Sequence, residues 1–262
     1  MAGRETMLLD RILAALMFFT RLPFWKIRQP AKACFEHVVE YWPFAGWLTG
    51  GAMALAYFVL STMFPPLVSA LGAISVRLLL TGALHEDGLA DFCDGFGGGV
   101  GRARILEIMK DSRIGTYGVL GLVMYVAMFA SLMSSLPVGA APFCIFVADV
   151  YGKCCAGFII HQLPYARKAQ EAKSGVVYAA WGRREAWLQA GRCGLALVPA
   201  AVWMLYAEIS FPVWALLVPP VAEMLLARLM RRKIGGYTGD CCGAAFLLCE
   251  LSIYFPLVIY NS

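Results

Sequence analysis

Residues 81–118 read TGALHEDGLADFCDGFGGGVGRARILEIMKDSRIGTYG and interrupt a chain that is otherwise strongly hydrophobic. Four carboxylates fall within nine residues of this segment, at Glu86, Asp87, Asp91 and Asp94. Five glycines follow between positions 95 and 101, and four basic residues come next, at Arg102, Arg104, Lys110 and Arg113. Because acidic residues, glycines and bases are concentrated here, we take this segment as the candidate functional centre.

Three of the carboxylates share a helical face, because Asp87, Asp91 and Asp94 stand at positions i, i+4 and i+7. Neighbouring negative charges repel one another, so we expect a cation to offset them. Mg²⁺ prefers oxygen ligands and often shares them with substrate phosphates. We therefore predict a Mg²⁺ site formed by Glu86, Asp87, Asp91 and Asp94. The alternative is a solvated acidic loop, and the glycines match neither the P-loop nor the dinucleotide-binding pattern.

The composition places the chain in a membrane. Of its 262 residues, 60% are hydrophobic and 15% are charged, whereas a soluble domain carries about a quarter charged residues. The net charge of +5 comes from loops and does not indicate a nucleic-acid partner. We predict a single domain over residues 1–262, an all-α polytopic membrane protein without a cleavable signal peptide.

Seven apolar stretches are long enough to span a bilayer, which takes about 20 residues each. They are residues 42–61, 66–84, 117–136, 139–160, 188–207, 211–229 and 243–260. Before them, residues 7–22 carry apolar side chains at helical spacing. That segment predicts an amphipathic helix that lies in the membrane surface.

The basic residues of the connections predict the orientation. The connections 62–65, 137–138 and 208–210 and the tail 261–262 contain no Lys or Arg, whereas the N-terminal segment and the other connections contain several. Cytoplasmic loops are enriched in Lys and Arg. We therefore expect a cytoplasmic N-terminus, an external C-terminus and motif-bearing loops that all face the cytoplasm.

Among the ionisable residues inside the predicted spans are Arg77, Asp149, Lys153, Arg192, Glu223 and Glu250. Each costs about 2.5–3.5 kcal/mol near the middle of a membrane, so we expect either pairing between helices or a place in a site. Asp149 and Lys153 are four residues apart and can pair on one face. Arg77 precedes the acidic cluster by about two turns and can reach toward it. Of the six, Asp149 is the one that we place nearest to a site.

A second polar segment, RRKIGGYTGDCCGAA at 231–245, precedes the last span. A turn followed by a helix N-terminus offers free N–H groups to an anion. Gly236 and Thr238 are therefore candidate phosphate contacts, and Asp240 either caps the helix or takes part in catalysis. A third segment, PYARKAQEAKSG at 164–175, adds Arg167 on the same side.

These segments together resemble a known family. HEDGLADFCDGFGGG (85–99) and LEIMKDSRIGTYGVLGL (106–122) are similar to the main motif of cobalamin synthases, the adenosylcobinamide-GDP ribazoletransferases. FFTRLP (18–23), PYAR (164–167) and GGYTGDCCGA (235–244) fall where that family has its other motifs. The resemblance covers most of the chain. Cys93, the Cys241–Cys242 pair and the segment around Asp149 depart from the family pattern.

The resemblance implies an enzyme of the bacterial or archaeal cytoplasmic membrane that uses Mg²⁺ and two substrates. The ribose 3′-hydroxyl of α-ribazole, or of its 5′-phosphate, attacks the corrinoid-side phosphate of adenosylcobinamide-GDP and releases GMP. In this reaction we expect catalytic roles for Asp240, Asp91 and Asp94. We expect the substrates and their phosphates to contact His85, Arg102, Lys110, Asp111, Arg113, Arg167, Gly236 and Thr238. Association of copies as a homo-oligomer stays open.

Two alternatives have different consequences. The DxxDG element at 91–95 is shared with CDP-alcohol phosphotransferases, although the AR that those phospholipid enzymes carry three residues past the glycine is absent at that spacing here. An ion-coupled transporter would also hold a cation with such carboxylates. Transporters place that site near the middle of the membrane between related repeats, and this sequence shows no repeat.

Overall fold

The structure of the chain is a computed structural model that describes residues 2–168 and 176–262, with residues 2–6 described by their backbone only. The described part is helical. The longer helices are α1 (Ala2–Phe19), α2 (Trp42–Ser61), α3 (Pro66–Thr81), α4 (Leu84–Gly98), α6 (Thr116–Ser134), α7 (Ala141–Gly157), α9 (Arg183–Tyr206), α10 (Val218–Ile234) and α11 (Gly239–Asn261). Shorter helices are α5 (Arg102–Ile108) and α8 (Ile159–Gln162), with 3-10 segments η1 (Phe24–Lys26), η2 (Lys32–Tyr41) and η4 (Val213–Leu217).

The helices confirm a polytopic membrane protein. Among the described residues, six helical stretches are long and apolar enough to cross a membrane, and α3 with α4 passes the same test as a bent pair. The predicted count of seven spans therefore holds when this pair is one broken span. The predicted span 42–61 coincides with α2. The predicted span 66–84 corresponds to α3, which ends at Thr81 rather than at residue 84.

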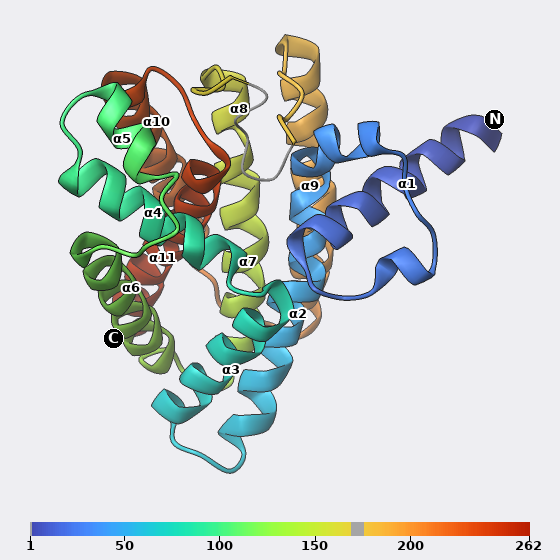
Figure 1. Cartoon of the computed structure of the whole chain (residues 1–262). Coiled ribbons are helices and arrows are strands. Elements are labelled where there is room, and N and C mark those ends of the chain that lie inside the picture. The colour runs from blue at the N-terminus through green and yellow to red at the C-terminus, as the bar shows by residue number, and fades with distance from the viewer. Residues whose placement is uncertain (1, 169–175) are drawn as a thin grey trace.

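The elbow between α3 and α4 has a backbone cause. Gly82 has φ 67° and Ala83 has φ 57°, so two consecutive residues adopt the left-handed conformation that stops a helix. The two helices consequently meet at 94°. Hydropathy alone predicts one apolar run over residues 66–84, whereas the turn at Gly82 and Ala83 directs α4 across the bundle (Figure 1).

Helix α7 lies at the centre of the bundle, between α2, α9 and α11 (Figure 1). Small residues let α2 approach it closely: a Cβ on Gly50 would lie 2.9 Å from the Cβ of Asp149. Close backbone approach through small residues is typical of helices packed in membranes. Side chains on this core helix are consequently buried from end to end.

Helix α1 confirms the predicted N-terminal helix, although it ends at Phe19 rather than at residue 22. Leu13, Ala14 and Phe19 are buried against the bundle, whereas Leu8 and Leu9 are about half exposed, at 50% and 48%. After the helix ends, the Arg21 N–H donates a hydrogen bond to the Leu80 carbonyl over 2.8 Å. The end of α1 is thus fastened to the elbow.

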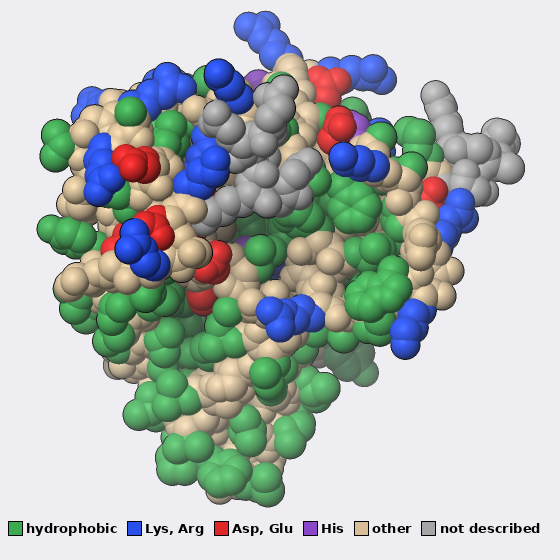
Figure 2. Space-filling view, viewed as in Figure 1, with side chains coloured by type: hydrophobic (Ala, Val, Ile, Leu, Met, Phe, Trp, Pro, Cys, Tyr) green, Lys and Arg blue, Asp and Glu red, His purple; other side chains and the backbone are tan. Residues whose placement is uncertain are grey.

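The surface divides by chemistry along the bundle. Figure 2 shows the Lys and Arg side chains of this face over its upper and middle parts, and hydrophobic side chains over its lowest part. Helix α5 and the start of α9 lie at the upper end in the same view (Figure 1). Arg102, Arg104, Arg183 and Arg184 are exposed there. The basic end is therefore also the end that carries the candidate site.

Candidate functional site

Helix α4 carries the acidic segment, and its residues differ widely in exposure. Asp87 is exposed and Asp91 is half-buried, whereas Glu86 and Asp94 are buried. The helix predicted from the i, i+4, i+7 spacing is confirmed. Its three aspartates do not share one environment, because the helix lies between α11 and α6.

Asp94 is held by the next helix. Its Oδ2 accepts a hydrogen bond from the Gly115 N–H over 2.6 Å, and its Oδ1 accepts one from the Gly118 N–H over 2.8 Å. These donors belong to the start of α6, where backbone N–H groups have no partner within the helix. A Cβ on Gly118 would lie 2.4 Å from Oδ2, so glycine is needed for this approach. Asp94 therefore joins α4 to α6.

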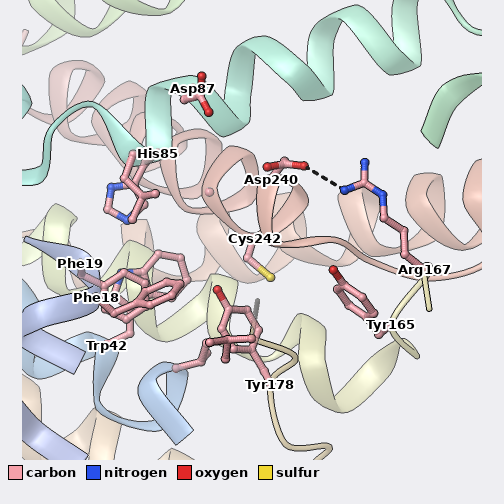
Figure 3. A pocket seen from close by; sticks show the side chains of 15 residues that line it. Phe18, Phe19, Trp42, His85, Asp87, Tyr165, Arg167, Tyr178, Asp240 and Cys242 are labelled. Atoms are coloured by element: carbon pink, nitrogen blue, oxygen red, sulfur yellow. Dashed lines mark ion pairs between the residues drawn. The ribbon is translucent and has the colours of Figure 1, made fainter. Parts of the chain in front are cut away.

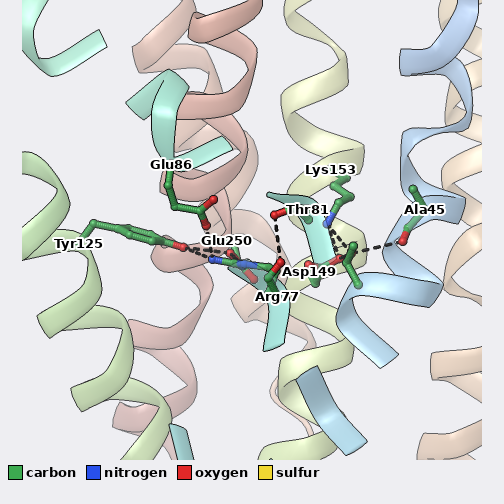
Figure 4. A network of polar contacts seen from close by, with 9 residues as sticks. Ala45, Arg77, Thr81, Glu86, Tyr125, Asp149, Lys153 and Glu250 are labelled. Carbon is green, nitrogen blue, oxygen red and sulfur yellow. Dashed lines mark hydrogen bonds and ion pairs between the residues drawn. The ribbon is translucent and has the colours of Figure 1, made fainter. Parts of the chain in front are cut away.

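Glu86 turns to the interior of the bundle (Figure 4). It pairs with Arg77 over 3.2 Å, and Arg77 also contacts Glu250 of α11 and donates a hydrogen bond to the Tyr125 hydroxyl over 2.7 Å. The expected reach of Arg77 toward the acidic cluster is confirmed. A buried charge is tolerated only when it is paired. Arg77 therefore fixes α4 against α3, α6 and α11.

Asp149 lies in the same interior. It accepts a hydrogen bond from Thr49 over 2.8 Å and forms the predicted ion pair with Lys153, in which both side chains are fully buried. Neither residue is among the described residues that line the cavities discussed next. The hypothesis that Asp149 is the interior charge nearest to a site is therefore not supported by its position.

Two cavities meet at α4. The first, the aromatic chamber, has about 250 Å³ and is lined by five aromatic rings together with polar residues of α4 and α11. The rings are those of Phe18, Phe19, Trp42, Tyr165 and Tyr178. The second, the acidic chamber, has about 510 Å³ and is lined by Glu86, Asp87, Asp91, Arg21 and Ser112 among others. Phe18, Leu84 and Asp87 belong to both walls, so Asp87 lies where the chambers adjoin.

Helix α11 brings Asp240 to the aromatic chamber. A Cβ on Gly88 would lie 2.9 Å from the Asp240 carbonyl oxygen, and a Cβ on Gly243 would lie 3.3 Å from the Cα of His85. The two helices therefore touch backbone to backbone beside Asp87. This close contact positions carboxylates from distant parts of the sequence along one cavity.

The N-terminal end of α11 bears on the capping role considered for Asp240. The N-cap is Thr238, whose Oγ1 accepts a hydrogen bond from the Cys241 N–H over 3.3 Å. The Asp240 carboxylate instead faces Arg167 over 3.8 Å (Figure 3). Arg167 also donates to the Leu106 carbonyl over 3.2 Å. Thr238, rather than Asp240, therefore caps the helix. Asp240 and Arg167 form a charged end of the aromatic chamber.

The remaining predicted phosphate contacts lie outside the chambers. Gly236, Thr238, Arg102, Lys110, Asp111 and Arg113 are not among the described residues that line either wall. Gly236 allows a tight approach, since its Cβ would lie 2.3 Å from the Pro164 carbonyl oxygen. Arg102 donates to the Ala166 carbonyl over 3.0 Å and so holds the segment that carries Arg167.

Asp111 and Arg113 pair with each other at the surface over 2.8 Å. Hydrogen bonds from the side chain and backbone of Arg113 lower the pKa of the Asp111 carboxyl to about 2. The carboxyl is consequently charged at neutral pH, and it forms an ion pair with the guanidinium of Arg113. The adjacent Ser112 lines the acidic chamber.

The donor set limits how a metal ion could be held. Among the described residues, no three His, Cys, Asp or Glu side chains are placed to hold a metal ion together. Mg²⁺ is commonly bound by one or two carboxylates, with water and substrate phosphates as further ligands. Asp87 and Asp91 lie one helical turn apart on the acidic chamber and provide two such carboxylates. The residues therefore fit a Mg²⁺ ion that a phosphate substrate helps to bind.

Comparison with known families matches residues 11–258 to the family described as Cobalamin-5-phosphate synthase. The chain belongs to this family. The chain is 34% identical to an adenosylcobinamide-GDP ribazoletransferase of Shewanella amazonensis over 96% of this chain and 95% of that one. It is 37% identical to the one of Leptothrix cholodnii over 92% and 91% of the two chains. No solved structure matches.

For this member of the cobalamin-5-phosphate synthase family, the sequence did not identify the aromatic residues of the chamber as site residues. Phe18 and Arg21 lie in FFTRLP, and Tyr165 lies in PYAR, two segments that carried only the resemblance. Trp42 and Tyr178 fall in no motif. Burial raises the pKa of the Tyr178 hydroxyl well above its usual value, so this hydroxyl stays protonated. Aromatic residues are common throughout this chain, so their number alone could not single these out.

Proposed function

We propose that the two substrates are joined at Asp87, where the aromatic and acidic chambers adjoin. The chain is an adenosylcobinamide-GDP ribazoletransferase, the activity named for its relatives. It joins adenosylcobinamide-GDP to ribazole or its 5′-phosphate and releases GMP. The observation that carries the proposed location is the position of Asp87 on both walls, with Asp91 on one side and Asp240 on the other.

The reaction forms and breaks one phosphorus–oxygen bond each. A ribose hydroxyl oxygen bonds to the corrinoid-side phosphorus of the pyrophosphate, and the bond from that phosphorus to the oxygen of GMP breaks. The hydroxyl loses its proton, and GMP departs with the electron pair. Such a displacement requires an in-line arrangement of the two oxygens and neutralisation of the phosphate charge. Two chambers with a common wall allow the nucleophile and the pyrophosphate to approach from opposite sides.

Asp87 and Asp91 are the residues that would hold Mg²⁺ at the acidic chamber. A Mg²⁺ ion there would neutralise negative charge on the pyrophosphate and on the departing GMP. Arg21, whose side chain lies across Gly82 on this wall, adds positive charge to the same chamber. Asp94 and Glu86 serve this pair indirectly, because their contacts to α6 and to Arg77 fix the position of α4.

Asp240 accepts the proton of the ribose hydroxyl. It lies in the first turn of α11 on the aromatic chamber, and its side chain is 14% exposed. Arg167 beside it favours the charged carboxylate, which is the form able to accept a proton. The same guanidinium is placed to contact a phosphate on the 5′ position of the nucleoside.

We further propose that the chambers face the cytoplasm from the bacterial or archaeal cytoplasmic membrane. The basic connections of the sequence and the basic end of the bundle in Figure 2 support this orientation. The phospholipid-forming and transport alternatives have no comparable support, because the relatives reported above are all named as ribazoletransferases.

Membranes that contain the chain test the activity and its metal requirement together. With adenosylcobinamide-GDP, α-ribazole and Mg²⁺ they should release GMP, and release should stop after EDTA and return when Mg²⁺ is restored. Calcium should restore it poorly, because Ca²⁺ prefers more ligands at longer distances. Absence of GMP release would contradict the activity. Full turnover after exhaustive EDTA treatment would contradict the metal site.

A further inference from the structure

The aromatic chamber has two chemically different ends (Figure 3). Phe18, Phe19, Trp42 and His85 gather at one end, whereas Asp240, Arg167 and Tyr165 lie at the other. Phe19 and Trp42 are stacked with ring centroids 4.9 Å apart, and the His85 ring is stacked on Trp42 at 5.5 Å. One end of the chamber is thus a wall of flat rings, and the other end is charged.

His85 is the unusual member of that wall. It is only 2% exposed, and neither of its ring nitrogens has a hydrogen-bond partner in the described part of the chain. Phe246 closes the other side of the ring at 4.8 Å. An imidazole carries at least one ring N–H donor in either of its tautomers. Buried polar atoms are rarely left unsatisfied, which points to a ligand as the missing partner.

We propose that the aromatic end of this chamber binds the benzimidazole base of ribazole, and that His85 donates a hydrogen bond to the free ring nitrogen of that base. The inference rests on the proposed function, which supplies ribazole as a substrate. Benzimidazole is a flat, mostly apolar bicycle that stacks on aromatic rings. Its ring nitrogen that carries no sugar has an in-plane lone pair and accepts one hydrogen bond.

This orientation places the rest of the nucleoside correctly. With the base among Phe18, Phe19, Trp42 and His85, the ribose extends toward the Asp240–Arg167 end of the same chamber. Its hydroxyl then lies beside the carboxylate assigned as the proton acceptor. His85 is therefore a specificity-determining residue that contacts the base.

The guanine base of the other substrate fits this end less well. Guanine presents several donors and acceptors along its edge, and a site built for it needs a matching set of polar groups. Of the described residues that line the chamber, His85 and Trp42 are those with buried ring nitrogens that lack a partner. A corrin ring is far larger than a cavity of about 250 Å³. The nucleoside with the least polar base is the best match.

The test compares ribazole with an analogue whose free ring nitrogen is replaced by CH, which leaves an indole nucleoside of the same shape. KM for each nucleoside is measured from GMP release by the full-length enzyme at saturating adenosylcobinamide-GDP. For the wild-type enzyme we expect the indole nucleoside to have a KM about tenfold higher, the effect of one lost hydrogen bond to a buried group. This arm requires no substitution and does not depend on the folding of a variant.

His85→Phe supplies the second arm, because it keeps an aromatic ring and removes the donor. It should raise the KM of ribazole about tenfold and leave the KM values of the indole nucleoside and of adenosylcobinamide-GDP unchanged. His161→Phe is the matched control, since His161 bonds the Trp181 carbonyl over 2.9 Å away from both chambers. It should change none of the three values.

Two results would overturn the inference. Equal wild-type KM values for the two nucleosides would exclude a hydrogen bond to the ring nitrogen. A higher KM for adenosylcobinamide-GDP in His85→Phe, with that of ribazole unchanged, would assign the aromatic end to guanine. Failure of the proposed function is distinct from both, because wild-type enzyme would then release no GMP with either nucleoside.

Discussion

At the scale of single residues, the carboxylates of the acidic segment differ in their surroundings. The spacing predicted the helix and one face shared by Asp87, Asp91 and Asp94, but of these three only Asp87 and Asp91 line the acidic chamber. It could not predict that Asp94 accepts two hydrogen bonds from the start of α6, because those donors lie 21 and 24 residues further along the chain. Glu86 likewise pairs with a residue of α3. Contacts between helices, which a single sequence does not display, decide these roles.

This division predicts different defects for Asp87→Asn and Asp94→Asn. Asp87→Asn should reduce GMP release by about 10²-fold or more, since an exposed carboxylate that holds the metal is lost, and should leave the unfolding temperature unchanged. Asp94→Asn should destabilise the fold by about 2 kcal/mol, because an amide group replaces a charged acceptor of two backbone hydrogen bonds. Thermal unfolding of the purified proteins in detergent, beside the activity assay, measures both. Unchanged stability of Asp94→Asn would show that its bonds to α6 are unimportant.

At the scale of helices, the contact between α4 and α11 sets the distance between Asp87 and Asp240, the two carboxylates of the proposed site. Gly88 is the point of contact, because a Cβ there would lie 2.9 Å from the Asp240 carbonyl oxygen and 3.1 Å from its Cα. Those atoms belong to a helical backbone and cannot move aside as a flexible side chain can. The sequence showed both glycine and acid in each motif. It did not show that the two motifs face one another.

Gly88→Ala should therefore separate α4 from α11 and lower kcat by about 10²-fold, which is the usual effect of displacing catalytic groups by about 1 Å. Gly51→Ala in α2 is a matched control, because a Cβ at Gly51 meets nothing within 4 Å. The control should keep full activity and gain up to about 1 kcal/mol of stability from its better helix propensity. Normal kcat in Gly88→Ala would mean that the contact does not position the site.

At the scale of the whole molecule, hydropathy and charge predicted the membrane class, six of the spans and the surface helix. Residues 66–84 were predicted as one span, whereas α3 ends at Thr81 and α4 meets it at 94°, because an apolar run contains no information on chain direction. Ala83 adopts a left-handed conformation although it is not a glycine, so its residue type did not predict the turn. The aromatic chamber combines residues from α1, η2, α2, α4, α11 and the connection between α8 and α9, a combination that only the fold reveals.

The bent pair makes the topology testable. If α3 and α4 together cross the membrane once, the chain has seven spans and its C-terminus is external. A reporter that is active only outside the cytoplasm should then be active when fused after residue 262. The same reporter inserted at residues 62–65 is a positive control, because that connection is external in either arrangement. Activity of a cytoplasmic reporter at the C-terminus would show that the pair re-enters and that six helices cross.

A Mg²⁺ titration of kcat tests most directly whether proton transfer and metal binding belong to different chambers. The titration compares Asp240→Asn with the wild-type enzyme. In the proposed mechanism Asp240 accepts the proton of the ribose hydroxyl, and Asp87 and Asp91 would hold the metal. We predict a kcat lower by about 10²- to 10⁴-fold, the usual worth of a general base, with half-maximal activity at the same Mg²⁺ concentration. A raised Mg²⁺ requirement would make Asp240 a metal ligand, and an unchanged kcat would remove it from catalysis. Either result would contradict the proposed arrangement.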